Sequence, residues 1–372
     1  MSTFNEIELS TDIDHLKEKV SNLEQNTLVH LHLTDPQNFD MDYNKSKDSP
    51  LRHVLCSCIG KKFDLSPTDF SNNPCDIILN GTFLDCKNLV KIGQLPHVSS
   101  YIGTFENCHA LETVDWSIFD KAEYLDSTFQ NCDCPTIKVD GSYFGHVDNA
   151  HNTFNGMSNL IEIYNPNFDK IIKANGMFDG CRNLKHIDTS FDHLRAADSM
   201  FKNCSSLEKI DTSYFGDVET ASEIFYNCNS LKEITDFSFF RYCDNLSFAF
   251  AHCNNLQQID GSCFHSVTNA TCMCMGTPIT SFDSSCCNLV KSANDMFRDC
   301  KNLKYIDLSN FKSISDASNM FKNCANLDSI SLDIFSSSVL DDNAFNSTNR
   351  EIEDAFFALK NKIKDVDLFD ME

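Results

Sequence analysis

A short pattern of apolar residues returns every 22 to 25 residues through most of the chain. It is clearest after Phe297: Leu303 follows six residues later, Ile306 three residues after that, and a second aromatic residue stands at Phe311. A fixed period of this length is typical of a solenoid, in which each coil packs only on its neighbours. One isolated coil cannot bury these side chains, so several must stack to form a core.

Counting the first aromatic residue of each unit as position 0 sets the number of coils. One step spans two periods, and Met273 takes the aromatic position in its middle. The sequence therefore predicts an α/β repeat, a leucine-rich-repeat solenoid of about twelve coils, with short parallel strands, short helical turns and a cap at each end. The first aromatic residues are Phe83, Phe105, Phe129, Phe154, Phe178, Phe201, Phe225, Phe250, Phe297, Phe321 and Phe345.

The repeat resembles the BspA-type leucine-rich repeat, which is common in bacterial and protist surface proteins. The segments Met320 to Ile330 and Ile306 to Phe311 carry the resemblance, which covers roughly residues 81 to 348. It implies a leucine-rich-repeat solenoid that binds proteins, and it supplies no catalytic residues. The usual surface proteins of this family have an export signal, and this chain shows none.

The first 80 residues do not follow the repeat, and we expect them to form an N-terminal capping region. Apolar spacing predicts a helix over 11–25 and another over 51–59, and alternation predicts a strand over 28–33. Residues 63–66 echo the repeat and indicate a degenerate first coil. A functional rather than capping role for the first helix is the alternative.

The other domain boundaries follow from where the repeat stops. We expect the solenoid to occupy residues 81–348, and residues 349–372 to form a C-terminal capping helix with an acidic tail. Ile352, Phe356, Leu359 and Ile363 share one face of that helix at helical spacing, and this face should close the core.

The chain carries 30 basic and 54 acidic residues, a net charge of −24. Nucleic-acid binding needs a basic footprint, so we expect no nucleic-acid partner, and an anionic membrane surface would repel the chain. A basic protein is the complementary partner, because opposite fields speed encounter. The alternative is that the acidity only keeps a long apolar stack in solution.

The N-terminus has no basic start followed by an apolar run, so it is not a secretory signal. No stretch approaches eighteen apolar residues, so no membrane span is expected. The chain should be cytoplasmic, or delivered by a secretion system that reads no cleaved signal.

Nine of the nineteen cysteines occupy position 3. Stacked coils would place them in a buried column, where cysteine behaves as a small apolar residue. Disulfides between neighbours are the alternative, but equivalent side chains point in parallel, which strains a bridge. We therefore expect reduced cysteines. The nine are Cys86, Cys108, Cys132, Cys181, Cys204, Cys228, Cys253, Cys300 and Cys324.

Two coils are irregular. After Phe129, Cys134 and Pro135 replace the leucine and shift the strand by one residue. In the coil at Met273, Gly276 is expected to replace the column cysteine, and Cys272 to take the methionine position. Such departures mark function or neutral change.

The cysteines around Cys272 raise two chemical alternatives, a zinc site and an enzyme. Cys272, Cys274, Cys286 and Cys287 match no standard zinc spacing, so we expect no metal. The chain also lacks a phosphate-binding loop, a nucleophile elbow and a zinc-protease motif. We expect no cofactor and no catalytic residue.

An aspartate follows the strand aliphatic in many coils. It bonds the backbone N–H groups of the following turn, or it forms an acidic stripe that meets lysine or arginine on a partner. These aspartates are Asp115, Asp140, Asp188, Asp211, Asp260, Asp283 and Asp307.

Our first functional hypothesis is a non-enzymatic binding protein that engages a folded, basic protein as an inhibitor, an immunity-type protein or an effector. The alternatives are an exported adhesion module and an enzyme that uses the Cys272 region. Contact residues should flank the strands and vary between coils, and Trp116 is the expected hot spot unless it only packs at the strand end. The candidates are Glu112, Asp115, Trp116, Glu162, Tyr164, Lys185, His186, Asp188, Glu208, Asp211, Lys232, Gln257, Asp260, Lys304, Tyr305 and Asp307.

Overall fold

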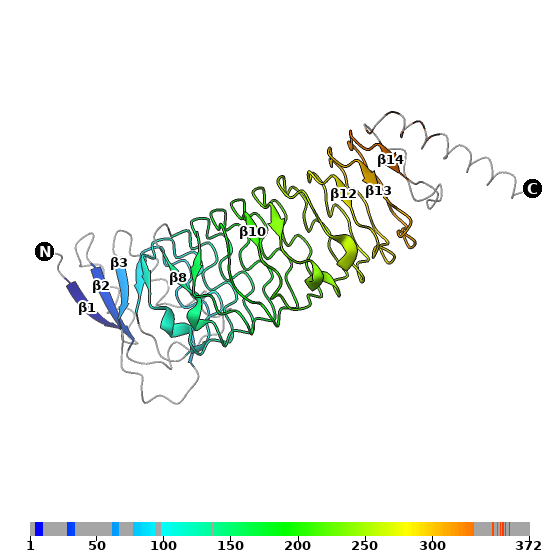
Figure 1. Cartoon of the computed structure of the whole chain (residues 1–372). Helices are drawn as coiled ribbons and strands as arrows, with labels where there is room; N and C mark the ends of the chain where they lie inside the picture. Colours follow the sequence, from blue (N-terminus) through cyan, green and yellow to red (C-terminus); the bar gives the residue numbers. More distant parts are fainter. Residues whose placement is uncertain are drawn as a thin grey trace, which may run out of the picture. The chain divides into compact units, whose positions relative to one another are not determined.

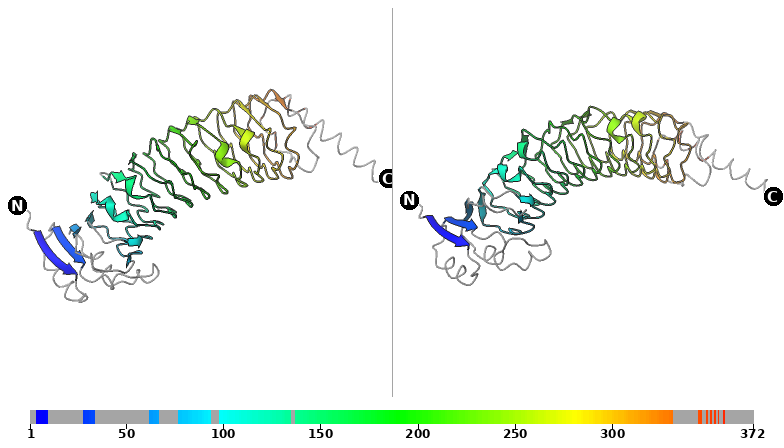
Figure 2. Two further views of the ribbon diagram at one scale, coloured as in Figure 1. Left: turned by 60° about the horizontal axis from the view of Figure 1, so that its bottom comes forward. Right: turned by 90° about the horizontal axis from the view of Figure 1, so that it is seen from below.

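The computed structural model describes residues 4–9, 28–33, 62–66, 77–93, 98–134 and 137–330, together with 344, 345, 348, 350, 352, 354 and 357. Backbone contacts divide the chain into two units, residues 1–193 and 194–372. Each is described by itself below. Within each unit, successive coils lie side by side (Figures 1 and 2).

The first unit begins with a five-stranded parallel sheet in the order β1, β2, β3, β5, β7 (Figure 1). The predicted strand over 28–33 is confirmed as β2, and the degenerate coil supplies β3, whereas β1 was not predicted. Strand β3 precedes the expected domain boundary at residue 80, and it pairs with β5, which follows that boundary. The boundary itself stays a prediction. The helices expected over 11–25 and 51–59 lie outside the described residues. The strands are Phe4–Leu9 (β1), Leu28–Leu33 (β2), Lys62–Ser66 (β3), Leu89–Ile92 (β5) and Thr113–Val114 (β7).

The remaining strands are short and pair only in parallel with the next coil, as the repeat predicts. In the first unit they are β4 (Ile77–Ile78) with β6 (Val98–Ser100), and β8 (Val139–Asp140) with β9 (Ile163–Tyr164). In the second unit they are β10 (Lys209–Ile210) with β11 (Glu233–Ile234), and β12 (Ser281–Phe282), β13 (Tyr305–Ile306) and β14 (Ser329–Ile330) in that order.

In the part of the chain that the structure describes, four single turns of 3-10 helix lie near the second aromatic residue. They are η2 (Trp116–Phe119) and η3 (Gly141–Tyr143) in the first unit, and η4 (Ser238–Phe240) and η5 (Gly261–Cys263) in the second. Together with the strands they give the predicted mixture of short parallel strands and short helical turns.

The segment around the first aromatic residue is a run of tight turns. Left-handed residues interrupt it two positions before and two positions after the aromatic, as at Glu223 (φ 57°) and Asn227 (φ 61°) on either side of Phe225. In this conformation alternate N–H groups donate to the next coil: Phe225 N to Ala249 O at 2.9 Å, and Asn227 N to Ala251 O at 2.8 Å. A second row of coil-to-coil hydrogen bonds therefore runs beside the strands.

The core of each unit is a column of stacked aromatic rings. In the first unit the rings from Phe83 to Phe178 follow one another with centroids 5.5 to 6.1 Å apart. In the second unit the rings of Phe201, Phe225 and Phe250 stack at 5.6 and 6.1 Å. The rings are at most 1% exposed, which confirms that the repeated aromatics are core.

The column of cysteines at position 3 is also confirmed: all nine are buried. Their thiols do more than fill space, because in six of them the Sγ–H group donates to the carbonyl of the first aromatic residue of the preceding coil. Cys108 reaches Phe83 O at 3.1 Å, and Cys228 reaches Phe201 O at 3.0 Å. The sixteen cysteines in the described part of the chain are all free.

The coil expected to start at Met273 is offset by one residue from that expectation. Phe250 N donates to Met273 O, and Cys300 Sγ donates to Cys274 O, so Cys274 holds the aromatic position. Thr277, not Gly276, then takes the column position, and its Oγ1 lies 3.5 Å from Cys300 Sγ. Cys272 is the left-handed residue (φ 55°), not the residue at the methionine position.

The other predicted irregularity, after Phe129, is confirmed. Val139 pairs with Ile163, although Val139 stands one residue later in its coil than Ile163 does. Cys134 fills the leucine site, is 2% exposed, and donates its thiol to Cys108 O at 3.2 Å.

At the C-terminal end, the backbone at Arg350, Ile352, Asp354 and Phe357 is helical. Ile352 is 5% exposed, and the capping role of this face stays a prediction. The other three residues of that predicted face lie outside the described residues. The part of the chain that the structure describes contains no helix with the length and hydrophobicity of a membrane span.

Candidate functional site

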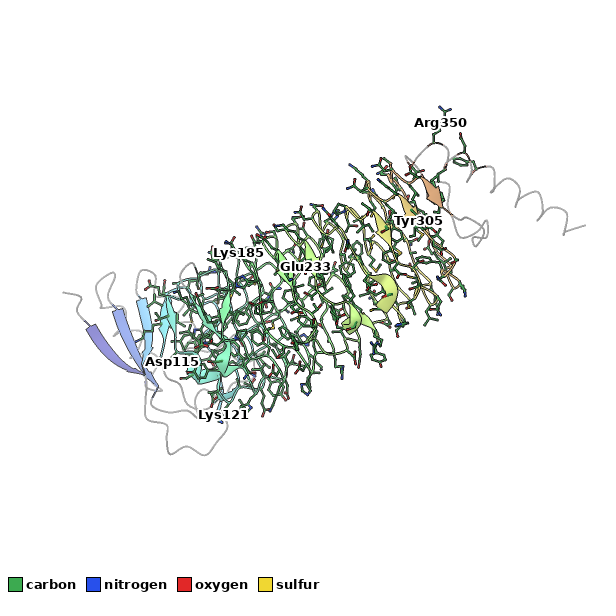
Figure 3. The ribbon with its side chains drawn as sticks, in the orientation of Figure 1. Asp115, Lys121, Lys185, Glu233, Tyr305 and Arg350 are labelled. Atoms are coloured by element: carbon green, nitrogen blue, oxygen red, sulfur yellow. The ribbon has the colours of Figure 1, made fainter. Side chains whose placement is uncertain are left out.

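The candidate site is the row of side chains at positions 7, 8 and 10 of each coil, which we call the strand face. These residues flank the strand aliphatic at position 9, which points into the core. Figure 3 labels four of them, Asp115 and Lys185 in the first unit and Glu233 and Tyr305 in the second. The strand face is described below for each unit in turn.

In the first unit, the candidate side chains group around β9. His186 Nε2 lies 3.8 Å from Glu162 Oε2, and Lys138 Nζ lies 5.9 Å from the centroid of the Tyr164 ring. A hydrogen bond with Glu162 raises the pKa of the Tyr164 hydroxyl, which is 42% exposed. Glu112, Lys185 and Asp188 are also exposed.

Trp116 is buried, which favours the alternative that it only packs at the strand end. It is 7% exposed and its ring packs on Phe129 and Phe144 with centroids 5.3 and 6.1 Å away. Its Nε1–H donates to Lys138 O at 2.8 Å. The indole is therefore part of the core, and its polar atom is already satisfied.

The repeated aspartates cap turns, which favours the first of the two interpretations. The Oδ1 atom accepts the N–H two residues later, at 3.2 Å in Asp115, 3.0 Å in Asp211, 2.9 Å in Asp260 and 2.8 Å in Asp307. Bonds from the following serine lower the pKa of Asp211 and Asp307. Asp140 and Asp283 make the same bond, and Asp188 makes none within the described residues.

In the second unit, two ion pairs of opposite polarity join the coil of β10 to the coil of β11. Lys232 Nζ lies 2.8 Å from Glu208 Oε2, and Lys209 Nζ lies 2.8 Å from Glu233 Oε1. The Glu233 carboxylate raises the pKa of Lys209. All four side chains are more than half exposed, so solvent screens both pairs. The pairs neutralise this part of the strand face.

A groove of 590 Å³ opens beside these pairs, between β11 and the next coil. Three of the predicted contact residues line it, Lys232, Gln257 and Asp260. Lys304, Tyr305 and Asp307 are exposed in a later coil, with Tyr305 55% exposed. The structure thus brings together some candidates at the groove and leaves others on separate coils.

Sequence reasoning missed several groove residues, namely Asp236, Phe237 and Gln258. The signal was present: the coil from Phe225 is 25 residues long, Thr235 stands where neighbouring coils have aspartate, and Asp236 follows it. Asp236 takes over the capping role, with Oδ1 accepting Ser238 N at 2.8 Å.

The cysteines at 272 and 274 are buried. Cys272 and Cys274 are 7% and 0% exposed, and burial raises the pKa of Cys272 to about 11. Burial also raises the pKa of Cys274, so both thiols are protonated at neutral pH. Within the described residues, no group of three or more potential ligands is arranged to hold a metal ion.

Comparison with known proteins gives one family and several solved structures. The family described as "BspA type Leucine rich repeat region (6 copies)" matches this chain over residues 61–142, 126–253, 206–293 and 238–369. A comparison with curated proteins finds no match.

The solved structures share little sequence identity with this chain. A leucine-rich repeat protein from Eubacterium ventriosum is 13% identical (TM-score 0.33), over 93% of this chain and 88% of that one. A leucine-rich cell surface protein from Faecalibacterium prausnitzii is 16% identical (TM-score 0.25), over 77% of this chain and 84% of that one. The receptor chain of a TLR13–ssRNA13 complex is 15% identical (TM-score 0.24); the match covers 89% of this chain and 60% of the receptor chain. The repeat match covers most of the sequence, and the chain belongs to the BspA-type leucine-rich repeat family.

Proposed function

We propose that this chain is a non-enzymatic protein-binding repeat protein, whose strand face engages a folded, basic protein. Its role would be that of an inhibitor, an immunity-type neutraliser or an effector. Membership of a leucine-rich repeat family supports a binding function, and the net charge of −24 supports a basic partner, because complementary charge speeds association and rejects wrong partners.

One observation carries the proposal: the strand face varies while the core beneath it repeats. In three successive coils, position 6 is always a buried leucine, at Leu207, Leu231 and Leu256. Position 7 is exposed and differs each time, as glutamate, lysine and glutamine. Core packing does not require position 7 to differ between coils. A surface that must fit a binding partner accounts for the difference.

The free, buried thiols support a location under reducing conditions. Seven of the nine column sulfurs donate to a backbone carbonyl, as Cys253 does to Phe225 O at 3.0 Å. Disulfides persist in oxidising compartments and are rare in the cytosol. If the protein is taken from its native source and denatured, all nineteen cysteines should react with a thiol reagent. Cross-linked cysteines would instead favour an exported adhesion module.

A matched pair of variants tests the binding role. The immobilised protein would first capture its partner from native lysate, and affinities would then be measured with the purified partner. The strand-face variant replaces Glu112, Asp188 and Tyr305 with alanine. The control replaces Glu219, Asp192 and Tyr242, which are also exposed but lie beyond the second aromatic position.

We expect the strand-face variant to weaken binding at least about tenfold, since interface contacts concentrate in a few residues, and the control to change it less than twofold. Raising the salt concentration should weaken the wild-type complex, because exposed charges are screened. Equal affinities of the two variants would overturn the proposed binding face, and salt-independent binding would overturn the basic partner.

A further inference from the structure

The groove between the coils of Phe225 and Phe250 combines an apolar floor with polar walls. Ile234 and Phe237 form the floor and are 6% and 7% exposed. The Phe237 ring is fixed by its neighbours, with centroids 5.9 Å from Phe250 and 6.4 Å from Phe240. The walls are Lys232, Glu233, Thr235, Asp236, Asn255, Gln257, Gln258 and Asp260.

The charges in the walls do not cancel. Lys232 and Glu233 are each paired with a residue of the preceding coil at 2.8 Å, so neither leaves a net charge in the groove. Asp236 and Asp260 are the remaining ionised groups. Each carboxylate makes its capping bonds to a serine, and an ionised carboxylate has about four acceptor sites, so both keep the capacity to accept more hydrogen bonds.

Amide groups complete the groove. Gln257 and Gln258 are exposed, and within the described residues their side chains make no hydrogen bond. Asn255 Nδ2 donates to Asn229 O at 2.6 Å, which leaves its carbonyl oxygen as an acceptor. These acceptors stand beside the two carboxylates and suit a cation with several N–H donors.

We propose that this groove binds an arginine side chain of the basic partner, which refines the proposed function and rests on it. Guanidinium is planar, carries five donors in a fixed fork, pairs with carboxylates through two parallel bonds and packs on aromatic rings. Asp236 and Asp260 offer the carboxylates for such pairing, and Phe237 offers the aromatic ring. A lysine ammonium would satisfy the charge but not the planar contacts, so the groove selects arginine over lysine.

The test uses the full chain and short peptides as probes. Binding of acetyl-Gly-Arg-Gly-amide would be followed by nitrogen-15 NMR, with the lysine and citrulline peptides in parallel. We expect saturable shifts at the side-chain amides of Gln257 and Gln258, at least threefold weaker binding of the lysine peptide and no binding of the citrulline peptide.

The variant is Asp236→Asn with Asp260→Asn, which removes both charges but keeps an oxygen to cap each turn. The matched control is Asp316→Asn, in a coil outside the groove, away from the strand face and with the same bond to a serine N–H. Binding of the arginine peptide should fall at least tenfold in the double variant and less than twofold in the control. Undiminished binding by the double variant, equal binding of the citrulline or lysine peptide, or no binding of the arginine peptide would each overturn the inference.

These outcomes are separate from a failure of the proposed function. The partner recovered from lysate should bind the double variant at least tenfold more weakly as well. If it binds the double variant normally but loses affinity for the Glu112, Asp188 and Tyr305 variant, the arginine groove is wrong while the strand face stands. If neither set of substitutions matters, the strand-face function itself is wrong.

Discussion

At the scale of single residues, the cysteine at position 3 recurs in nine coils. Each is buried, and where its thiol bonds the aromatic carbonyl of the preceding coil it adds a second hydrogen bond: Phe201 O accepts both Cys204 N–H and Cys228 Sγ–H. Burial raises the pKa of Cys253 and Cys300 to about 12, from an ordinary value of 9.0. This shift makes the stability of the fold depend on pH.

The sign of the pH effect follows from which state keeps the proton. Below pH 9 the thiols are protonated in both states, and their contribution to stability is complete. Between about pH 9 and 12 the unfolded chain loses protons that the folded chain keeps, so the free energy of unfolding falls by about 1.4 kcal/mol per pH unit for each such thiol. Urea denaturation from pH 7 to 11 measures the slope.

The Cys253→Ala variant isolates one thiol from the rest. It should be less stable at neutral pH because it leaves a cavity, but its stability should fall less steeply above pH 9. Parallel pH curves for the variant and the wild type would contradict this account of the buried thiol.

Trp116 gives a second residue-scale prediction. Trp116→Ala should lower the free energy of unfolding by about 3–5 kcal/mol, as expected for a large side chain removed from a core. Trp116→Phe keeps most of the packing and loses the bond to Lys138 O, which costs about 1 kcal/mol. Urea midpoints measure both. Partner affinity should be unchanged in Trp116→Phe, and a tenfold loss of affinity in that stable variant would restore Trp116 as a contact residue.

At the scale of the coil, the turn around the first aromatic residue depends on left-handed backbone. Gly180 has φ +77°, and a Cβ added there would meet only Gly156, 3.5 Å from its Cα. Gly176 has φ +63°, and its Cβ would clash with Asn152 Oδ1. The two glycines therefore share the conformation but differ in the space around them.

Alanine substitutions separate conformation from space. Gly180→Ala should cost about 1–2 kcal/mol, the strain of a left-handed alanine. Gly176→Ala should cost clearly more, because Asn152 must also move. Thermal or urea unfolding of the two variants gives the comparison, and an equal loss would mean that the Asn152 contact has no energetic consequence.

The sequence predicts the coil well where each position has one chemical type. The period, the columns of Phe and Cys, and the parallel strands follow from spacing alone. The offset at Cys274 does not, because Met273 and Cys274 are both apolar and either fits a buried position. The left-handed residues are also hidden, since Glu223 and Phe248 adopt φ of 57° and 58° without being glycine. Tertiary hydrogen bonds between coils impose that conformation.

The candidate site is less predictable than the fold. Exposure at positions 7 and 8 follows from the repeat, and Lys185, Lys232 and Gln257 are exposed as expected. The burial of Trp116 depends on how large rings fill one particular coil. The groove depends on Asp236 standing one residue later than the usual aspartate, which no regular pattern anticipates.

At the scale of the whole molecule, the two units are built in the same way. Each has a core that repeats and an exposed row of side chains that does not. Stability is then shared among many similar contacts, and single changes on the strand face leave the stack intact. This separation lets the binding surface vary without affecting the fold.

Carboxyl footprinting of the protein with its recovered partner tests the central claim most directly, because it reports which acidic side chains the partner covers. We predict that binding protects Glu112, Asp188, Asp260 and Asp307 from a carbodiimide label and leaves Asp192, Asp217, Glu219 and Asp244 as reactive as in the free chain. Protection of the second set with the first set unchanged would contradict a strand-face binding surface.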